Sequence, residues 1–228
     1  MRHCVIIVAG GSGSRFGSAV PKQFLELAGK PVLMLTIDAF EQALAQKSHE
    51  ITVVLPQAQI GYWQQLCKSY GFATAHKVVA GGNTRFESVK NGLGSFGSFA
   101  AEDLVAVHDG VRPLVTPRVI ADTFAMAAEK GSAIPVVRVV DSVRLLGDDG
   151  KSEAMDRSKL RAVQTPQTFN AQMLSAAYDV DYDPLFTDDA SVFERAGHEV
   201  WLCDGDERNL KITHKLDLTI AEKLLESE

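Results

Sequence analysis

The sequence predicts an α/β protein with a Rossmann-like, doubly wound, mostly parallel sheet and helices on both faces of the sheet. Short apolar runs rich in β-branched residues are typical of strands buried on both faces, and segments with helical periodicity alternate with them. The 228 residues, of which 46% are hydrophobic and 23% charged, have an ordinary globular composition. We therefore expect residues 1–228 to form one domain, and a disordered or fibrous chain is excluded.

Strands and helices alternate regularly through the first half of the chain. Strands are expected at 4–9, 51–55, 77–80 and 104–108, and helices at 31–44, 59–70, 83–93 and 117–130. Pro31 suits the first turn of a helix, and Asn83 and Thr84 are good capping residues. Strand–helix alternation of this kind requires right-handed crossovers between parallel strands.

The pattern changes after Ser132. Residues 133–146 read as extended, Asp149 and Gly150 form a strong hairpin-turn signal, and residues 160–164 look like a returning strand. Residues 139–163 therefore predict a protruding β-hairpin arm. Because a lone hairpin has little core of its own, Leu145 and Leu146 are expected to pack on the parent domain or on a second copy. Helices at 170–178, 188–196 and from 215, with strands at 199–203 and 209–212, complete the expected fold.

Charge and cysteine content indicate the cellular compartment of the protein and the classes of partner that it can bind. Lys plus Arg number 23 against 29 Asp plus Glu, which gives a net charge of −6. Such a balance argues against a nucleic-acid partner, because neutralising phosphates requires a basic face. Three cysteines far apart in sequence fit a reducing compartment, and no apolar run is long enough for a membrane span. We expect a cytoplasmic protein without a membrane partner.

Three predicted strands end in loops that combine glycines with a cation. These loops are residues 10–22 with Arg15 and Lys22, residues 81–85 with Arg85, and residues 108–113 with Arg112. Ligands of open α/β sheets bind at the carboxyl ends of the strands, and glycine-rich backbone can approach an oxyanion closely. For Arg15 or Lys22 alone, a solvated side chain on a connecting loop would be the simpler interpretation. The three loops together favour a polyphosphate site.

Two common phosphate loops do not fit the first of these segments. A Walker A loop needs Gly-Lys followed by Ser or Thr, whereas Lys22 lies between Pro21 and Gln23. In a dinucleotide fingerprint the third glycine would stand where the chain has Phe16, and no acidic residue follows the second strand. A nicotinamide-dependent dehydrogenase is therefore disfavoured.

Seven segments, in order, resemble the 2-C-methyl-D-erythritol 4-phosphate cytidylyltransferase family. They are residues 9–17 (AGGSGSRFG) with 21–24 (PKQF), 81–89 (GGNTRFESV), 108–113 (HDGVRP), 156–157 (DR), 164–167 (QTPQ), 187–191 (TDDAS) and 209–213 (NLKIT). The resemblance spans nearly the whole chain. It implies a nucleotidyltransferase of the non-mevalonate isoprenoid pathway, which joins CTP to the polyol phosphate and releases pyrophosphate.

The resemblance also implies roles for individual residues. Arg15 and Lys22 would stabilise the transition state, and Arg157 and Lys211 would position the polyol phosphate. The nucleotide would be bound by Gly10, Gly11, Ser12, Gly13, Gly82, Asn83, Ser88, Asp109 and Gly110. The second substrate would be bound by Asp109, Arg112, Ser142, Thr165 and Thr187. The arm would carry Ser142 and Arg157 into the active site of a second copy, so a homodimer with shared sites is expected.

Magnesium is the expected cofactor, held mainly by triphosphate oxygens, since Mg²⁺ prefers phosphate ligands and retained waters. Asp109 is the nearest candidate carboxylate for the ion, and binding a substrate hydroxyl is an equally good interpretation of it. Asp188 and Asp189 could form a metal pair, but charges at a helix N-terminus are the favoured interpretation. His108 is interpreted as packing at a strand end rather than as a base.

The chain departs from the family pattern at a few positions. Gly110 and Val111 stand where alanines are usual, Ser142 where threonine is common, and Arg161 where the family commonly has an aromatic residue. Arg161 adds a cation without an assigned role. Two alternatives remain open at this point: a ribitol 5-phosphate cytidylyltransferase, and a non-catalytic nucleotide-binding module of the same fold.

Overall fold

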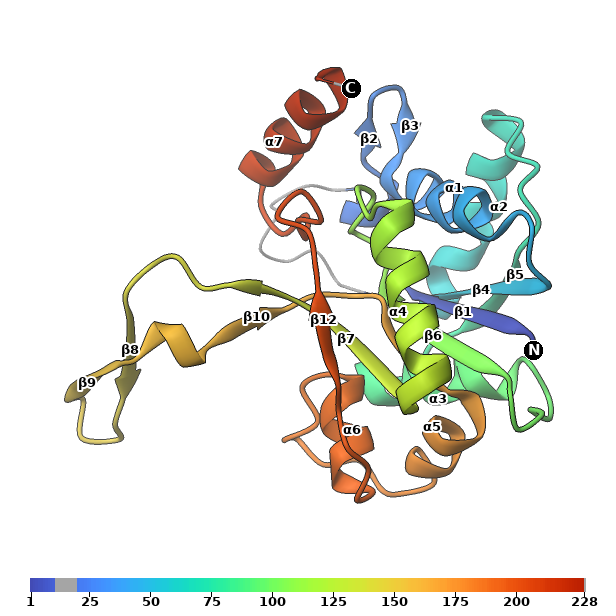
Figure 1. The fold of residues 1–228 in the computed structure, drawn as a ribbon. Coiled ribbons are helices and arrows are strands. Elements are labelled where there is room, and N and C mark those ends of the chain that lie inside the picture. The colour runs from blue at the N-terminus through green and yellow to red at the C-terminus, as the bar shows by residue number, and fades with distance from the viewer. Residues whose placement is uncertain (11–19, 228) are drawn as a thin grey trace.

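A mixed sheet runs through the middle of the structure, a computed structural model that describes residues 1–10 and 20–227 (Figure 1). Within these residues the sheet has eight strands in the order β10-β7-β11-β6-β1-β4-β5, with β12 also paired to β7. The strands are β1 (His3–Val8), β4 (His49–Leu55), β5 (Lys77–Ala80), β6 (Leu104–Asp109), β7 (Ser132–Arg138), β10 (Arg161–Val163), β11 (Gln167–Asn170) and β12 (Leu202–Asp204). This confirms the predicted fold class.

The strand order reverses at β1. From β1 the chain passes to β4 and β5 on one side, and then returns to β6 on the other side, with all four strands parallel. Val8 at the end of β1 lies opposite Asp109 at the end of β6. A reversal of this kind leaves a crevice at the carboxyl ends of the two strands, where α/β proteins bind ligands.

Helices cover both faces of the sheet because side chains alternate along each strand. Val5 and Ile7 of β1 pack in the same apolar cluster as α1 (Val32–Leu44), α2 (Gln57–Ser69) and α4 (Pro117–Lys130). Cys4 and Ile6 point to the opposite face, toward α3 (Arg85–Gly94), α5 (Ala171–Ala177) and α6 (Asp189–Arg195). Burying each such isoleucine stabilises the fold by roughly 1.5–3 kcal/mol.

A third, smaller apolar cluster fixes the C-terminal helix. Ala221 of α7 (Lys215–Glu226) is fully buried with Leu27, which belongs to the hairpin of β2 (Glu26–Leu27) and β3 (Lys30–Pro31). Ile212, in the segment before α7, is buried in the same cluster. The segment that contains Lys211 is thereby held against the main body.

The arm projects away from the body, as Figure 1 shows. It consists of β8 (Val143–Leu146) paired with β9 (Ser152–Met155), and Gly150 in the connecting turn has φ of 76°. Residues 157–159 form a short 3-10 turn that leads into β10. Leu145 and Leu146 are 53% and 70% exposed, so they do not pack on the parent domain.

The pairing at the base of the arm agrees with the sequence-based expectation. The predicted returning strand at 160–164 is β10, and it pairs antiparallel with β7, which lies in the predicted extended segment 133–146. The turn predicted at Asp149 and Gly150 is also correct. The partner of β8 is β9, a strand that was not anticipated because its sequence SEAM lacks the apolar alternation that would reveal it.

Two expectations need correction. Residues 209–212 form no strand, because the backbone N–H groups of Asn209 and Leu210 donate within the preceding turn, to the carbonyls of Asp206 and Arg208. The strand expected at 199–203 begins only at Leu202. The short strands β2, β3 and β11 were not anticipated. Across the described residues, no helix is sufficiently long and apolar to cross a membrane.

Candidate active site

A cavity of about 350 Å³ opens at the carboxyl ends of β1, β5 and β6. It brings together seven of the predicted site residues from segments far apart in the chain. These residues are Gly10, Lys22, Gly82, Asn83, Ser88, Asp109 and Lys211. Val111 and Thr213 also line the cavity, although the sequence gave no separate reason to select them.

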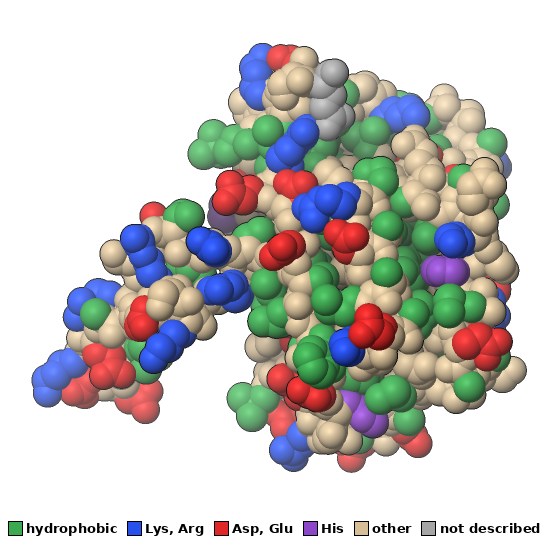
Figure 2. Space-filling view, viewed as in Figure 1, with side chains coloured by type: hydrophobic (Ala, Val, Ile, Leu, Met, Phe, Trp, Pro, Cys, Tyr) green, Lys and Arg blue, Asp and Glu red, His purple; other side chains and the backbone are tan. Residues whose placement is uncertain are grey.

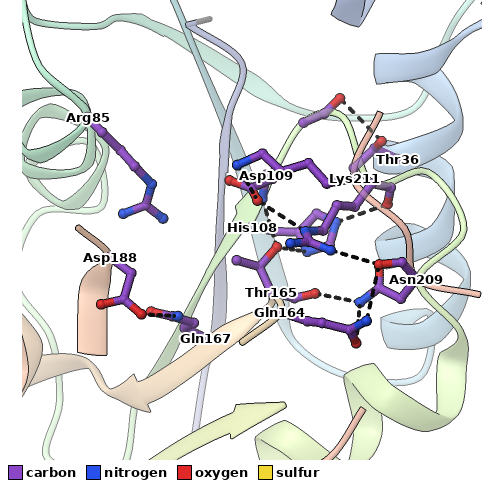
Figure 3. A network of polar contacts seen from close by, with 12 residues as sticks. Thr36, Arg85, His108, Asp109, Gln164, Thr165, Gln167, Asp188, Asn209 and Lys211 are labelled. Carbon is purple, nitrogen blue, oxygen red and sulfur yellow. Dashed lines mark hydrogen bonds and ion pairs between the residues drawn. The ribbon is translucent and has the colours of Figure 1, made fainter. Parts of the chain in front are cut away.

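Asp109 is the central charged group of the site (Figure 3). Its Oδ2 atom lies 3.1 Å from Lys211 Nζ and 3.1 Å from Arg112 Nε. Burial by itself would raise the pKa of Asp109, but Lys211, Arg85 and Arg112 outweigh that effect and bring the pKa well below its ordinary value. Asp109 is therefore an anion held between cations, with Lys211 oriented at the wall of the cavity.

A buried histidine and a threonine lie beneath Asp109. The hydroxyl of Thr165 accepts a hydrogen bond from the Asp109 backbone N–H at 3.0 Å and contacts His108 Nδ1 at 3.1 Å. His108 Nε2 lies 3.1 Å from the Arg112 carbonyl, so Nε2 carries the proton and Nδ1 accepts from Thr165. Burial lowers the pKa of His108 to about 4, so the ring is neutral near pH 7. Its edge-on packing with Phe40 matches the packing role expected for it.

Arg112 is fixed from the opposite side by the segment that leads to Lys211. Its Nη1 atom donates to the Asn209 carbonyl at 2.7 Å, and the Gln164 side chain donates to the Asp206 carbonyl at 2.8 Å. Figure 3 shows Gln164 and Asn209 below the Asp109–Lys211 pair. The network connects β6 to a segment about a hundred residues later in the chain, and thereby fixes where Lys211 enters the site.

The loop after β5 is shaped by its own side chains. Ser88 Oγ accepts from the Gly82 N–H at 3.2 Å and donates to the Thr84 carbonyl at 2.8 Å. Thr84 and Glu87 form the capping box that starts α3, as the sequence predicted for this helix start. Ser88 therefore holds the Gly82 backbone in place at the cavity wall, alongside its predicted role in nucleotide binding.

Gln23 anchors the turn that carries Lys22. Its buried side-chain amide donates to the Ala9 carbonyl at 2.7 Å and to Gln59 Oε1 at 2.7 Å. Both N–H groups of the amide are thus used, one on the residue that follows β1 and one on α2. The turn at residues 22–24 is thereby attached to the carboxyl end of β1, which places Lys22 beside the cavity.

Arg85 is a cation of the cavity wall that was not included among the predicted site residues. It pairs with buried Asp189 at 2.5 Å, and Tyr178 donates to the other oxygen of that carboxylate at 2.7 Å. Asp188 is the N-cap of α6 and accepts from the Ser191 N–H. Both aspartates thus lie at the start of α6, as the favoured interpretation expected, whereas the ion pair between Asp189 and Arg85 was not predicted. The combination of glycines and a cation in residues 81–85 was the sequence feature that could have identified Arg85 as a site residue.

Several predicted residues lie outside this cavity. Ser142 and Arg157 are exposed on the arm, Thr187 is exposed just before α6, and none of the three lines the cavity. Gly11, Ser12, Gly13 and Arg15 lie outside the described residues. Gly110 lies at the end of β6, where an added Cβ would come within 2.8 Å of the Ala9 Cβ, so an alanine does not fit here without rearrangement.

The fold and the polar cavity at the strand-order reversal define a nucleotide-binding α/β enzyme of the nucleotidyltransferase class. The family model for 2-C-methyl-D-erythritol 4-phosphate cytidylyltransferase matches residues 3–227, and the chain belongs to this family. A relative with that name in Phocaeicola vulgatus is 50% identical over 225 residues, covering 99% of this chain and 100% of the relative.

Solved structures agree with this membership. The cytidylyltransferase of that name from Thermus thermophilus has a TM-score of 0.78 at 29% identity, covering 99% of this chain and 100% of the other. The 4-diphosphocytidyl-2C-methyl-D-erythritol synthase from Anaerococcus prevotii has a TM-score of 0.80 at 26% identity, with coverage of 98% and 96%. The family recognised from seven sequence segments is thereby confirmed, and the ribitol phosphate alternative has no support among these relatives.

Proposed function

We propose that the chain joins CTP to 2-C-methyl-D-erythritol 4-phosphate, giving 4-diphosphocytidyl-2-C-methyl-D-erythritol and pyrophosphate in the non-mevalonate isoprenoid pathway. The observation that supports this best is the Asp109 carboxylate held between Lys211 and Arg112, in a cavity that also contains Lys22 and the Gly82 loop. Family membership supplies the substrate names, and the cation-rich cavity suits two phosphorylated substrates.

The reaction needs charge stabilisation more than proton transfer. The attacking phosphate oxygen is already an anion, so no general base is required, and buried neutral His108 is not called on as one. The oxygen bonds to the α-phosphorus of CTP, and the bond to the leaving pyrophosphate breaks with its electron pair. Lys22 would stabilise the charge that builds on these oxygens, together with Arg15 as the resemblance implies.

Lys211 and Asp109 would orient the acceptor substrate. Lys211, kept in place by Asp109, offers ammonium protons to the acceptor phosphate. Among the described residues, Asp109 Oδ1 has no hydrogen-bond partner, and it is placed to accept from a polyol hydroxyl. Holding the acceptor in this way lowers the entropic part of the barrier.

We further propose a homodimer in which the arm completes the site of a second copy. Ser142 and Arg157 lie on the arm and not at the cavity of their own chain, while exposed Leu145 and Leu146 lack a packing partner in the described chain. A closed twofold dimer would bury these leucines and bring both polar residues to the other cavity at once. The cytoplasm remains the proposed location.

Magnesium is proposed as the cofactor, held mainly by the triphosphate. Among the described residues there is no cluster of three or more His, Cys, Asp or Glu side chains that could cage a metal. Among the described residues that line the cavity, Asp109 is the one with a carboxylate, and its Oδ2 atom already contacts two cations. A bound Mg²⁺ would neutralise phosphate charge, and Asp109 would contribute at most one ligand to it.

Pyrophosphate release tests the proposal directly. With Mg²⁺ and CTP, the methylerythritol phosphate should support rapid release, while ribitol 5-phosphate should be a poor acceptor and ATP or GTP poor donors. Equal turnover of ribitol 5-phosphate would reject the acceptor assignment and leave the cytidylyl transfer standing. No release with any acceptor, from a protein that binds CTP, would favour a non-catalytic nucleotide-binding module.

A further inference from the structure

Two arginines face each other across the strands at the base of the arm. Arg161 of β10 is the direct cross-strand partner of Arg138 of β7 in an antiparallel pair. Directly opposed like charges destabilise a sheet. The pair is therefore a local cost to the fold unless an anion lies between or above the two guanidinium groups.

Among the described residues, no acidic side chain forms an ion pair with either arginine. The ion pairs of the arm within these residues are Lys151 with Asp149 and Lys159 with Asp156, and neither includes Arg138, Arg157 or Arg161. Arg161 Nη1 instead donates to the carbonyls of Ser158 and Leu160, at 2.9 and 2.8 Å. Since each guanidinium has five N–H donors, most of these donors remain available to an external acceptor.

The three arginines share one surface hollow, which we call the neck site. It is lined by Arg138, Val139, Val140, Arg157, Ser158 and Arg161. Arg157 is steadied there by a hydrogen bond to the Val140 carbonyl, so its guanidinium and the Arg138–Arg161 pair face the same space. Figure 2 shows Lys and Arg side chains along the arm, several of them where the arm approaches the body, and both acidic and basic side chains at its tip.

We propose that Arg138 and Arg161 form, with Arg157, an anion site that binds the phosphomonoester of the acceptor substrate. This inference rests on the proposed function, which uses Arg157 of the arm to position that phosphate. A phosphomonoester dianion presents three oxygens, which suit several guanidinium donors at once. The site gives a role to Arg161, whose charge is a departure from the aromatic residue common in the family.

Steady-state kinetics of neutral variants test the neck site. Arg138→Gln and Arg161→Gln should each raise the KM for the methylerythritol phosphate about threefold to tenfold, and the double variant more than tenfold. The KM for CTP should stay within about twofold, and the difference from the unchanged chain should shrink at high salt. Arg161→Lys should recover most of the affinity, because it keeps the charge.

Arg144→Gln is the matched control. Arg144 is also an arginine of the arm, but its guanidinium donates hydrogen bonds to the hydroxyl and the carbonyl oxygen of Ser152. This variant should leave the KM for the acceptor unchanged. Sedimentation velocity should show the same dimer for every variant. An unchanged KM for the acceptor, or an equal effect of Arg144→Gln, would overturn the inference. Dissociation of the Gln variants into monomers would also overturn it, because the arginines would then be bound to an acidic residue of a second copy rather than to the acceptor phosphate.

Calorimetric titration with inorganic phosphate separates this inference from the proposed function. The unchanged chain, without CTP, should bind phosphate more tightly than the double variant by the same factor as the KM change. Phosphate binding does not depend on turnover. If the unchanged chain is inactive, but binds phosphate more tightly than the double variant, only the proposed function is contradicted. Equal phosphate binding by both proteins, with normal turnover, would contradict only the neck site.

Discussion

Thr165 holds Asp109 by its backbone: the threonine hydroxyl accepts a hydrogen bond from the Asp109 N–H at 3.0 Å. The single hydroxyl proton is donated to His108, 3.1 Å away. Thr165 is only 5% exposed, and its hydroxyl already accepts one hydrogen bond and donates another, so the hydroxyl is not free to turn toward the cavity. We therefore expect Thr165 to affect the acceptor substrate through Asp109, as a positioning residue.

Replacing Thr165 tests this relationship. Thr165→Val removes both hydrogen bonds and leaves His108 Nδ1 and the Asp109 N–H unpaired, which should cost about 1–3 kcal/mol of unfolding free energy. The kcat/KM for the acceptor should fall about tenfold, because Asp109 and Lys211 lose their fixed orientation. Urea unfolding and steady-state kinetics measure the two effects.

Thr168→Val is the control for the same chemical change. Thr168 is fully buried, and its hydroxyl has no hydrogen-bond partner among the described residues. Removing an unpaired buried hydroxyl should leave stability equal or slightly higher, with normal kinetics. A Thr165→Val protein that behaves like Thr168→Val would show that the hydroxyl does not hold Asp109.

Lys22 should act mainly on the rate of the chemical step. Lys22→Ala removes a charge aimed at the reacting phosphates, so kcat should fall by on the order of 10²–10³, with a smaller change in KM. Lys30→Ala, an exposed lysine paired with Asp38 at 3.2 Å, is a control that should keep normal kcat. The rate of pyrophosphate release measures kcat. A near-normal kcat in Lys22→Ala would show that Lys22 does not stabilise the transition state.

A shared active site predicts complementation between two inactive chains. In a mixed dimer of Arg157→Ala and Lys22→Ala chains, one site has both residues and the other has neither, provided that Arg157 acts on the partner's cavity. Random exchange makes half of the dimers mixed, so activity should recover to about a quarter of the unchanged level. Mass spectrometry checks the exchange. A fully exchanged mixture without activity would place Arg157 in the site of its own chain.

His108 should make stability depend on pH below neutrality. Burial lowers its pKa from the ordinary 6.5 to about 4, so between these values the unfolded chain binds a proton that the folded chain does not. Stability should therefore fall as the pH decreases through this window, by up to about 3 kcal/mol near pH 4. His3, whose pKa burial also lowers, adds in the same direction.

Urea unfolding between pH 4.5 and 7.5 measures this contribution. His108→Asn should give a shallower loss of stability toward low pH than the unchanged chain, because its side chain does not titrate. His49 has a raised pKa, since hydrogen bonds to Glu41 and Lys47 outweigh burial, so it contributes with the opposite sign in both proteins and cancels in the comparison. Parallel stability curves for the two proteins would contradict the assignment to His108.

Local sequence patterns were enough to predict the layered α/β core and the edge of the sheet at which the candidate site residues gather. The strand predicted at 77–80 has those bounds in the structure, and the helix expected from Pro117 to Lys130 does as well. Buried parallel strands and amphipathic helices leave a local periodic pattern, so each can be recognised from its own residues. The glycine and cation at each strand end then indicated where a candidate anion site would lie.

Only the tertiary structure decided which distant residues meet. Arg85 and Asp189 lie 104 positions apart, and Thr165 lies 57 positions from His108, yet both pairs are in contact. Such contacts depend on strand register and helix packing, which the whole core sets together, and no local pattern of residues encodes them.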